Sequence, residues 1–426
     1  MRTQIPLWSA IPFLGVVLSV AVFPTFFPGF WRRYNILILA TFAIPVLFLS
    51  AAIDPTWVTR AFTDYVSFVC LMGALFSIGG GLYVSGTAKA NPITNLGYLA
   101  LGAVFANLLG TLGASMILVR PLLRSNRGRK HEAHVFIFFI FVVANAGILT
   151  PVSNPPLLMG YLMGVPFFWS LKLFPVWLFL ITSLLGIFVA VDSYFYLNDP
   201  DFRGPLKAES KQKLHITGRW NLALIPVLLF GLLIPQLIPN HLEIWREAFQ
   251  ISLLVAVTYV SRLLTPKLIS SLNEFSWEPL KEVAVIFAGI FATMIPALKL
   301  LEANELSLGL TTTSAFFWIS GIVSSLLDNA PAYAAFFAAA KGLGRDATMI
   351  SLSNGQTISE PLLFALTGGT VFFGALTYIG NVPNLLIKSI VEESGVKMPS
   401  FFSYLIWSIG FLLPVLFLTG IIFFEH

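Results

Sequence analysis

Long apolar segments separated by short polar loops make up almost the whole chain. Apolar runs of roughly 20 residues recur from one end to the other, and that length spans the ~30 Å hydrocarbon core of a bilayer as a helix. A membrane β-barrel would instead show apolar and polar residues in alternation along each strand, which this chain does not. The pattern predicts an all-α polytopic membrane protein that has the lipid bilayer as its surroundings.

Ten apolar runs are predicted to cross the membrane, and two more are expected to enter and leave on the same side. The crossings are expected near residues 7–25, 35–53, 62–84, 135–162, 168–191, 219–238, 244–263, 278–300, 357–390 and 401–424. The other two runs have small and polar residues at their centres, NLLGTLGAS (107–115) and SLLDNAPAY (325–333). Irregular backbone at membrane depth is tolerated only when it is buried in protein or lines a water-filled cavity. We therefore expect re-entrant hairpins at about 90–123 and 308–340.

Two short motifs break crossings in the same way. TPVSNPPLL (150–158) and TYIGNVPNL (377–385) share the pattern Thr-x-Val/Ile-Ser/Gly-Asn-x-Pro. The hairpin centres ANLLGT (106–111) and SSLLDN (324–329) also align, at a slightly smaller offset along the chain, because the second connecting loop is longer. The chain is thus predicted to hold two repeats, 1–195 and 219–426, joined by a cytoplasmic linker, 196–218. Five crossings and one hairpin per repeat give the repeats inverted topology, which together with broken helices at 135–162 and 357–390 is typical of secondary transporters.

The two breaks are candidate binding sites. A break at mid-membrane frees backbone groups, so that helix N-termini attract anions and unwound carbonyls coordinate cations. The alternative is that Pro and Gly only kink two packed helices. The matched pair of motifs favours a site with six contributors, the last of which lets the backbone approach closely: Thr150, Ser153, Asn154, Thr377, Asn381 and Gly380.

One acid lies deep in an apolar segment. Asp328 is flanked by the uncharged runs 308–327 and 329–340, and an ionisable group at that depth is a functional candidate by default. It would carry a proton, bind a cation, or do both in turn. The alternative is a structural cap of the second hairpin helix, and both roles can hold. Its counterpart in the first repeat is Gly110, so the two hairpins differ chemically.

Three further residues complete the predicted site. Asn107 and Thr111 at the first hairpin tip, and Asn329 beside Asp328, are weaker candidate ligands. The candidates for binding sodium itself are Asp328, Asn154 and Asn381.

Composition and charge agree with a membrane protein. The chain is 57% hydrophobic and 11% charged, with a net charge of +5 that does not indicate nucleic-acid binding. Lys and Arg gather in loops 124–134 and 197–219, which predicts that both are cytoplasmic loops of a multi-pass protein of the cell (inner) membrane. His131 and His134 lie in a basic loop with no cysteine or carboxylate pair nearby, so their spacing does not indicate a metal site. Glu278 and Glu282 begin a crossing and are expected at the membrane interface.

Several stretches resemble the ion-transporter superfamily, which holds NhaD-type sodium:proton antiporters, arsenite permeases, and citrate and dicarboxylate transporters. They are GASMILVRPLLRSN (113–126), LTPVSNPPLLMGYLMGVPFFW (149–169), WEPLKEVAVIFAGIFATMIP (277–296), SSLLDNAPAY (324–333) and TYIGNVPNLLIKSIVEESGVKMPSF (377–401). They look most like the branch labelled sodium:proton antiporter or citrate transporter. The resemblance implies a scaffold region, two transport regions with a hairpin and a broken helix each, alternating access and a homodimer.

Two departures from the superfamily concern the motifs themselves. The antiporter-like branch often has G-D-P-P where this chain has Ser153-Asn154-Pro155-Pro156. Dicarboxylate carriers carry S-N-T in both halves, and here the repeats read Ser-Asn-Pro and Gly-Asn-Val.

Three transport functions remain open from the sequence. A sodium or lithium/proton antiporter is favoured by the buried Asp328, with sodium and protons as the transported ions and no cofactor. A sodium- or proton-coupled symporter of citrate or a related carboxylate is the second reading, and an arsenite-type permease the third. A channel fits a hairpin pair around one acid less well. An enzyme is not expected, because there is no H-E-x-x-H, no pair of intramembrane aspartates and no Ser–His arrangement.

Overall fold

Helices make up nearly all of the structure, a computed structural model that describes residues 5–85, 91–199, 215–237, 243–273, 275–302, 310–343 and 348–425. By length and composition, eight helices in these ranges are long and apolar enough to cross a membrane, and one of the eight is Pro92–Asn126, whose backbone turns back at Gly110. The chain is therefore an all-α polytopic membrane protein, as predicted. Residues 200–214, which form most of the predicted linker 196–218 and of the loop 197–219, lie outside the described residues.

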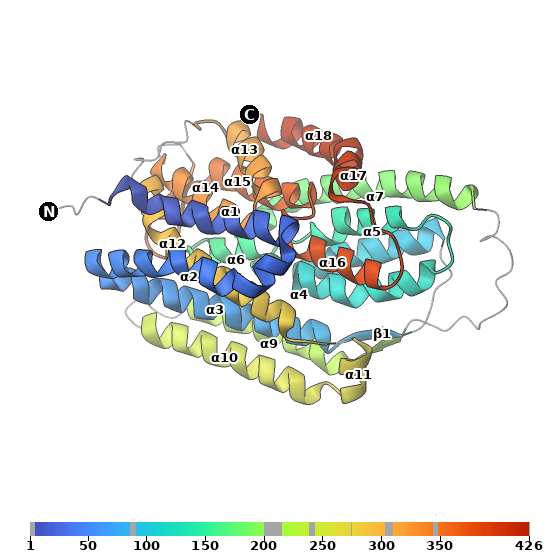
Figure 1. Ribbon diagram of the computed structural model, residues 1–426, viewed down its shortest axis with the longest axis horizontal. Helices are drawn as coiled ribbons and strands as arrows, with labels where there is room; N and C mark the ends of the chain where they lie inside the picture. Colours follow the sequence, from blue (N-terminus) through green and yellow to red (C-terminus); the bar gives the residue numbers. More distant parts are fainter. Residues whose placement is uncertain are drawn as a thin grey trace.

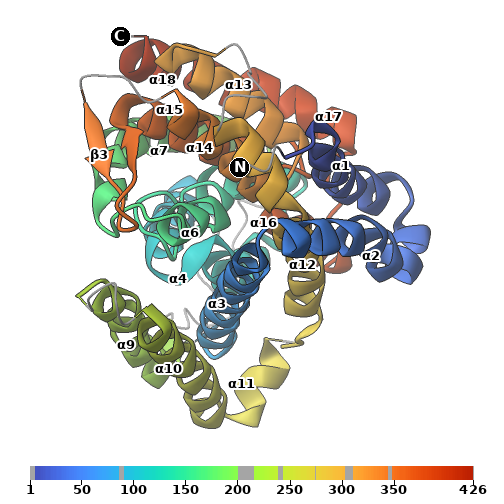
Figure 2. The same ribbon diagram turned by 90° about the vertical axis from the view of Figure 1, so that its left-hand side faces the viewer.

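One set of helices, here called the scaffold group, comes from the first part of each predicted repeat. In it α3 packs against α10 and α12, and α2 packs against α12. Strand β1 pairs antiparallel with β2, which links the end of α3 to the start of α9. Figure 2 shows α9, α10 and α11 at the edge of the molecule opposite α13, α15 and α18. The members are η1 (Leu7–Ala10), α1 (Ile11–Phe26), α2 (Pro28–Ile53), α3 (Pro55–Gly80), β1 (Tyr83–Ser85), β2 (His215–Thr217), α9 (Arg219–Leu237), α10 (Glu243–Leu264), α11 (Lys267–Leu272) and α12 (Glu278–Glu302).

The remaining elements form the hairpin group, which Figure 1 shows along the upper and right-hand parts of the molecule. From the first repeat they are α4 (Pro92–Asn126), α5 (Ala133–Phe139), η2 (Ile140–Ala144), α6 (Pro155–Leu162), η3 (Trp169–Leu173) and α7 (Phe174–Leu197). From the second they are α13 (Thr313–Leu326), α14 (Asn329–Gly342), β3 (Met349–Ser351), β4 (Thr357–Ser359), α15 (Glu360–Phe372), η5 (Phe373–Ala375), α16 (Val382–Glu393), α17 (Phe401–Trp407), η6 (Ser408–Leu412) and α18 (Leu413–Phe424). From Val135 to Ala144, α5 and η2 are apolar on every face and buried, as expected for a helix inside a bundle.

Both predicted hairpins fold back on themselves. Within α4 the backbone turns at Gly110, whose φ of 77° is available to glycine at little cost. The two arms then run antiparallel, so that Asn95 near one end bonds Asn126 near the other at 2.9 Å. In the second hairpin, α13 and α14 turn at Leu327–Asp328, and the rings of Phe316 and Phe336 lie 6.2 Å apart across the two arms.

Both predicted broken helices are interrupted at the motifs. Segment η2 ends at Ala144 and α6 begins at Pro155, while η5 ends at Ala375 and α16 begins at Val382. The residues before the new helices, Asn154 and Asn381, are extended, with φ of −157° and −154°. A proline disfavours the α conformation in the residue before it and suits the first turn of the helix that follows, so Pro155 explains the restart at α6.

Element bounds repeat at the offset of the motifs. Helix α5 begins at Ala133 and α15 at Glu360; helix α7 begins at Phe174 and α17 at Phe401. The two members of each pair are as far apart along the sequence as Thr150 and Thr377. The hairpins repeat at a smaller offset because the connection from α14 to α15 is longer than the one from α4 to α5. This longer connection contains the β3–β4 pair.

Candidate functional site

A cavity of about 390 Å³ lies between the two groups of helices, a size typical of small-molecule sites. From the scaffold group, its walls come from α1, α2, α3 and α12. From the hairpin group, they come from the first hairpin tip, the first helix break, Asp328 and the second break with α16. The exposed side chains of Arg32 and Glu282 mark its mouth.

Asp328 lines this cavity from the tip of the second hairpin. The residue is 8% exposed. One carboxylate oxygen accepts a hydrogen bond of 3.1 Å from the backbone N–H of Ala330, so the residue also caps α14. The two roles weighed from the sequence, a functional acid and a structural cap, are thus compatible in the geometry. A cap fixes the carboxylate at the N-terminus of α14, where negative charge is favoured.

Three other predicted residues reach the cavity from the first repeat: Thr111, Ser153 and Asn154. The N–H of Thr111 donates to the Ser153 carbonyl at 2.9 Å, which joins the hairpin tip to the helix break. Asn329 touches the group from behind, donating from Nδ2 to Asn154 Oδ1 at 3.4 Å. The cavity thus brings the first break and the second hairpin tip to one place.

The Asn154 amide has spare hydrogen-bonding capacity. Among the described residues, Asn154 Nδ2 and Asn329 Oδ1 are buried without a hydrogen-bond partner. The oxygen and the nitrogen of an Asn side chain have nearly the same shape, so the amide can also be placed the other way round. Turning both amides would keep the bond between them and present the Asn154 oxygen instead. Asn154 can therefore offer an oxygen to a bound cation.

The other predicted ligands lie behind the cavity wall and brace it. Thr150 donates to the Asn107 carbonyl at 2.6 Å, and Thr377 donates to the Ser325 carbonyl at 2.5 Å. These are the same bond at aligned positions of the two repeats. Asn107 itself accepts from the N–H groups of Ile148 and Leu149.

Asn381 and Gly380 also have bracing positions. Asn381 donates from Nδ2 to the Ala144 carbonyl at 3.0 Å, which ties the second break to the first. A Cβ on Gly380 would lie 2.9 Å from the Ser324 carbonyl, so its backbone lies close to the second hairpin. From the second break, the residues that do line the cavity are apolar, Ile379 and Val382.

Scaffold residues at the cavity were not singled out from the sequence as parts of the site. Arg32, Asn35 and Glu282 all line it. Glu282 was expected at the interface, and it lies where α12 passes the mouth. The sequence gives no signal for them, because no motif marks which face of a crossing meets a cavity.

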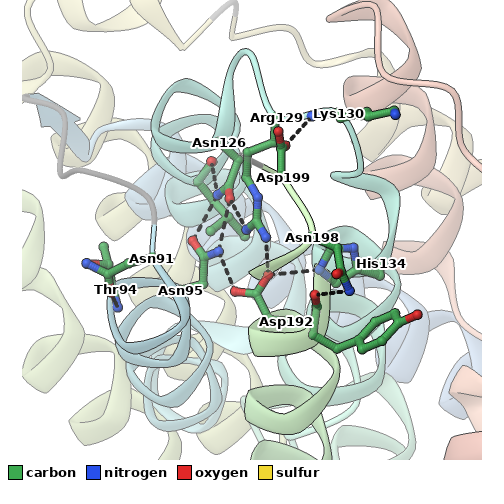
Figure 3. Close-up of polar contacts among 12 residues, drawn as sticks. Asn91, Thr94, Asn95, Asn126, Arg129, Lys130, His134, Asp192, Asn198 and Asp199 are labelled. Carbon is green, nitrogen blue, oxygen red and sulfur yellow. Dashed lines mark hydrogen bonds and ion pairs between the residues drawn. The ribbon is translucent and has the colours of Figure 1, made fainter. Parts of the chain in front are cut away.

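A buried polar cluster at the base of the first hairpin is a second finding that the sequence did not predict (Figure 3). Asp192 of α7 is fully buried and contacts Arg129 Nη2 at 2.6 Å and His134 Nε2 at 2.8 Å. Its other oxygen accepts from Asn95 at 2.9 Å, and Asn95 exchanges hydrogen bonds with Asn126. His134 therefore has a structural partner across the group.

This cluster ties both arms of α4 to α5 and α7. Breaking a buried ion pair leaves an uncompensated charge, which typically costs about 3–5 kcal/mol, so the base of the hairpin is firmly held.

Nearby, outside the membrane-spanning segments, burial raises the pKa of the Glu132 carboxyl and the positive charge of Arg129 opposes that rise. In the sequence, Asp192 is an acid near the end of a predicted crossing, far along the chain from the basic loop 124–134. Nothing in the sequence indicates that the two are in contact.

The candidate ion site has oxygen atoms from side chains and from unwound backbone. In the described ranges, no three or more His, Cys, Asp or Glu residues are grouped so as to hold a metal ion. The polar groups at the cavity include the Asp328 carboxylate, the Asn154 amide and the unwound backbone at Val152 and Ser153, besides the scaffold residues named above. Such oxygens are the ones that coordinate sodium in broken-helix sites.

Comparison with protein families gives one match over almost the full length. The family model described as "Putative citrate transport" matches residues 2–424. The chain belongs to this family. The membership agrees with the resemblance stated above and makes the protein a transporter. A comparison with curated proteins found no match.

Proposed function

We propose that the chain is a secondary active transporter that exchanges sodium or lithium for protons by alternating access. Asp328 binds a proton or a cation in turn, and Asn154, Ser153 and Thr111 complete the site. The observation that carries the proposal is a buried carboxylate, that of Asp328, which lines the cavity together with the Asn154 amide and the unwound backbone of the first helix break.

Two of the helix N-termini at the cavity, those of α6 and α14, offer few N–H groups to an anion. Helix α6 begins with Pro155 and Pro156, which have no N–H. At α14 the N–H of Ala330 is taken by Asp328, and the next residue is Pro331. A carboxylate substrate would need those donors, whereas a cation needs the oxygens that remain.

The repeated bonds support alternating access. Thr150 and Thr377 make the same bond to aligned hairpin residues, and the bounds of α5–α7 recur at the same offset in α15–α18. An odd number of crossings in each repeat would invert the second copy, so that two opposed halves surround one site. The basic loop 124–134 favours a cytoplasmic position for the base of the first hairpin.

A proton- or sodium-coupled symporter of citrate is the second candidate. The family description favours it, as does Arg32, a cation on the cavity wall. Against it, Glu282 and Asp328 share that wall and would repel a carboxylate.

Proton flux in inverted vesicles separates the two. An acid-inside gradient is imposed, and sodium, lithium, potassium or citrate is added in turn while a pH dye reports the lumen. Dequenching by sodium or lithium is the expected result. Uptake of labelled citrate with no response to any cation would sink the antiporter and make the broken helices a carboxylate site.

A further inference from the structure

The scaffold and hairpin groups meet where α3 packs against α4 and where α12 packs against α14. Helices α3 and α4 touch through bare backbone, because a Cβ built on Gly79 would lie 3.1 Å from the Cα of Gly113. Small residues allow helices to approach this closely within a membrane. At this point the two helices meet without a side chain between them.

A few side chains supply polar contacts across this boundary. In the described part of the chain, hydrogen bonds from the side chains of Arg120, Arg124 and Tyr161 join the two groups. Arg120 on α4 donates to the backbone carbonyl of Asn273. Arg124, one turn further, donates to the Val84 carbonyl at 2.6 Å and to the Tyr83 hydroxyl at 3.0 Å.

The third contact lies at the far end of a different helix. The Tyr161 hydroxyl, near the end of α6, donates to the Leu232 carbonyl of α9 at 2.5 Å. The arginines and this tyrosine therefore hold the hairpin group at two separated points.

The scaffold presents a built receptor for the arginines. Helix α3 ends at Gly80, and its last carbonyls are bound by amides of the scaffold itself. Asn273 Nδ2 donates to the Gly80 and Leu82 carbonyls at 2.8 Å each, and Asn221 Nδ2 donates to Gly81. Arg120 donates to the carbonyl of the same Asn273 whose amide binds Gly80 and Leu82, so this arginine docks on a part of the scaffold that is itself fixed by hydrogen bonds.

We propose that Arg120, Arg124 and Tyr161 form a lock that stabilises the arrangement with the cavity open at Arg32 and Glu282. The lock rests on the proposed function, because only a protein whose two groups move past each other would break and remake these bonds. The Asp192 cluster has the opposite role. It lies wholly within the hairpin group and stays intact while the lock opens.

Cysteine labelling tests the lock without any substrate. Cys70 is the single cysteine of the chain, so Cys70→Ser gives a clean background for Leu112→Cys, a reporter on the cavity wall at the first hairpin tip. A charged maleimide that does not cross membranes is applied from one face or the other. The ratio of the two labelling rates follows the ratio of the two arrangements.

Arg120→Gln and Arg124→Gln are combined in one variant. Because charge-assisted hydrogen bonds are lost, the labelling rate from the face on which the cavity opens is expected to fall about tenfold relative to the rate from the other face. Tyr161→Phe removes one oxygen and should move the ratio about two- to threefold in the same direction. Arg127→Gln is the matched control, because Arg127 is exposed at the end of the same helix. Its ratio should stay at the parent value.

An unchanged ratio in the double variant and in Tyr161→Phe would overturn the lock, and so would an equal shift in Arg127→Gln. The tyrosine variant keeps the test valid if the double variant fails to fold. Because no ion is added, a failed lock is distinguishable from a failed antiporter: labelling reports motion, and the vesicle assay reports which ion moves.

Discussion

The tips of the two hairpins, at Gly110 and at Asp328, lie at aligned positions and are braced to the helix breaks by the same threonine bond. Their chemistry differs. The first tip turns through a glycine at φ 77° and is joined to the break by backbone and side-chain bonds. The second turns through an acid that caps its own helix and lines the cavity. The hydrogen bonds between hairpin and helix break occur in both repeats, whereas the carboxylate occurs only at the second hairpin tip. We therefore expect one exchange site in each chain.

The largest effect is expected from the charge at the second tip. Asp328→Asn keeps the size and the capping ability of the residue, since asparagine caps helices as well as aspartate. It removes the group that binds the proton and should lower proton-coupled exchange at least ~100-fold, the scale at which a charged ligand is lost. Dye dequenching in vesicles measures the loss, and size-exclusion chromatography checks that the variant folds. Normal exchange by this variant would show that another group carries the proton.

Next in size is the contrast between the two motif asparagines. Asn154→Ala removes an amide at the cavity and should raise the half-saturating sodium concentration about tenfold, with little change in the maximal rate. Asn381→Ala removes a brace to Ala144 and should lower the melting temperature while sodium affinity stays within about twofold. Initial rates over a sodium series, with thermal melts of the same samples, separate the two. Equal affinity losses would mean that both amides bind the ion.

The glycine turn of the first tip should be intolerant of any side chain. A Cβ at Gly110 would meet the Val152 carbonyl at 3.1 Å, in a backbone region that other residues rarely adopt. Gly110→Ala should therefore destabilise the protein by about 1–3 kcal/mol. Gly97→Ala, where an added Cβ meets nothing within 4 Å, is the control. Comparable melting temperatures for the two variants would contradict the strained turn.

The smallest effect tests the equivalence of the braces. Thr150→Val and Thr377→Val each lose a hydrogen bond to a hairpin carbonyl, at a cost of about 1–2 kcal/mol. Thr377 also accepts from the N–H groups of Ile379 and Gly380, so its variant should be the less stable. Thr182→Val, at an exposed site that bonds only its own helix, should change stability by less than about 0.5 kcal/mol. The order of the three melting temperatures is the readout.

Much of the fold was predictable because the signals are local. A run of apolar residues fixes a crossing, and Pro155 fixes the restart of a helix whatever surrounds it. The two hairpins followed from small and polar residues at the centre of apolar segments, and the structure places a turn at both. The inverted relation of the repeats stays a prediction, supported by the common offset.

Part of the site could not be predicted because it depends on which faces meet. Polar residues in a motif look alike in sequence, yet Asn154 lines the cavity, whereas the Thr150 hydroxyl donates a hydrogen bond to a backbone carbonyl behind the cavity wall. Arg32 and Glu282 belong to crossings without a motif, and only packing brings them to the mouth. His134 and Asp192 are likewise joined by the packing of α5 against α7.

The most direct test of competition at Asp328 is proton release on sodium binding. Purified protein is placed in a weakly buffered solution near neutral pH, sodium chloride is added, and the pH is followed, with choline chloride as the control for ionic strength. Release of about one proton per chain, absent in Asp328→Asn, is the result expected if one carboxylate exchanges the two ions. Sodium binding without proton release, or the same release from Asp328→Asn, would contradict the account.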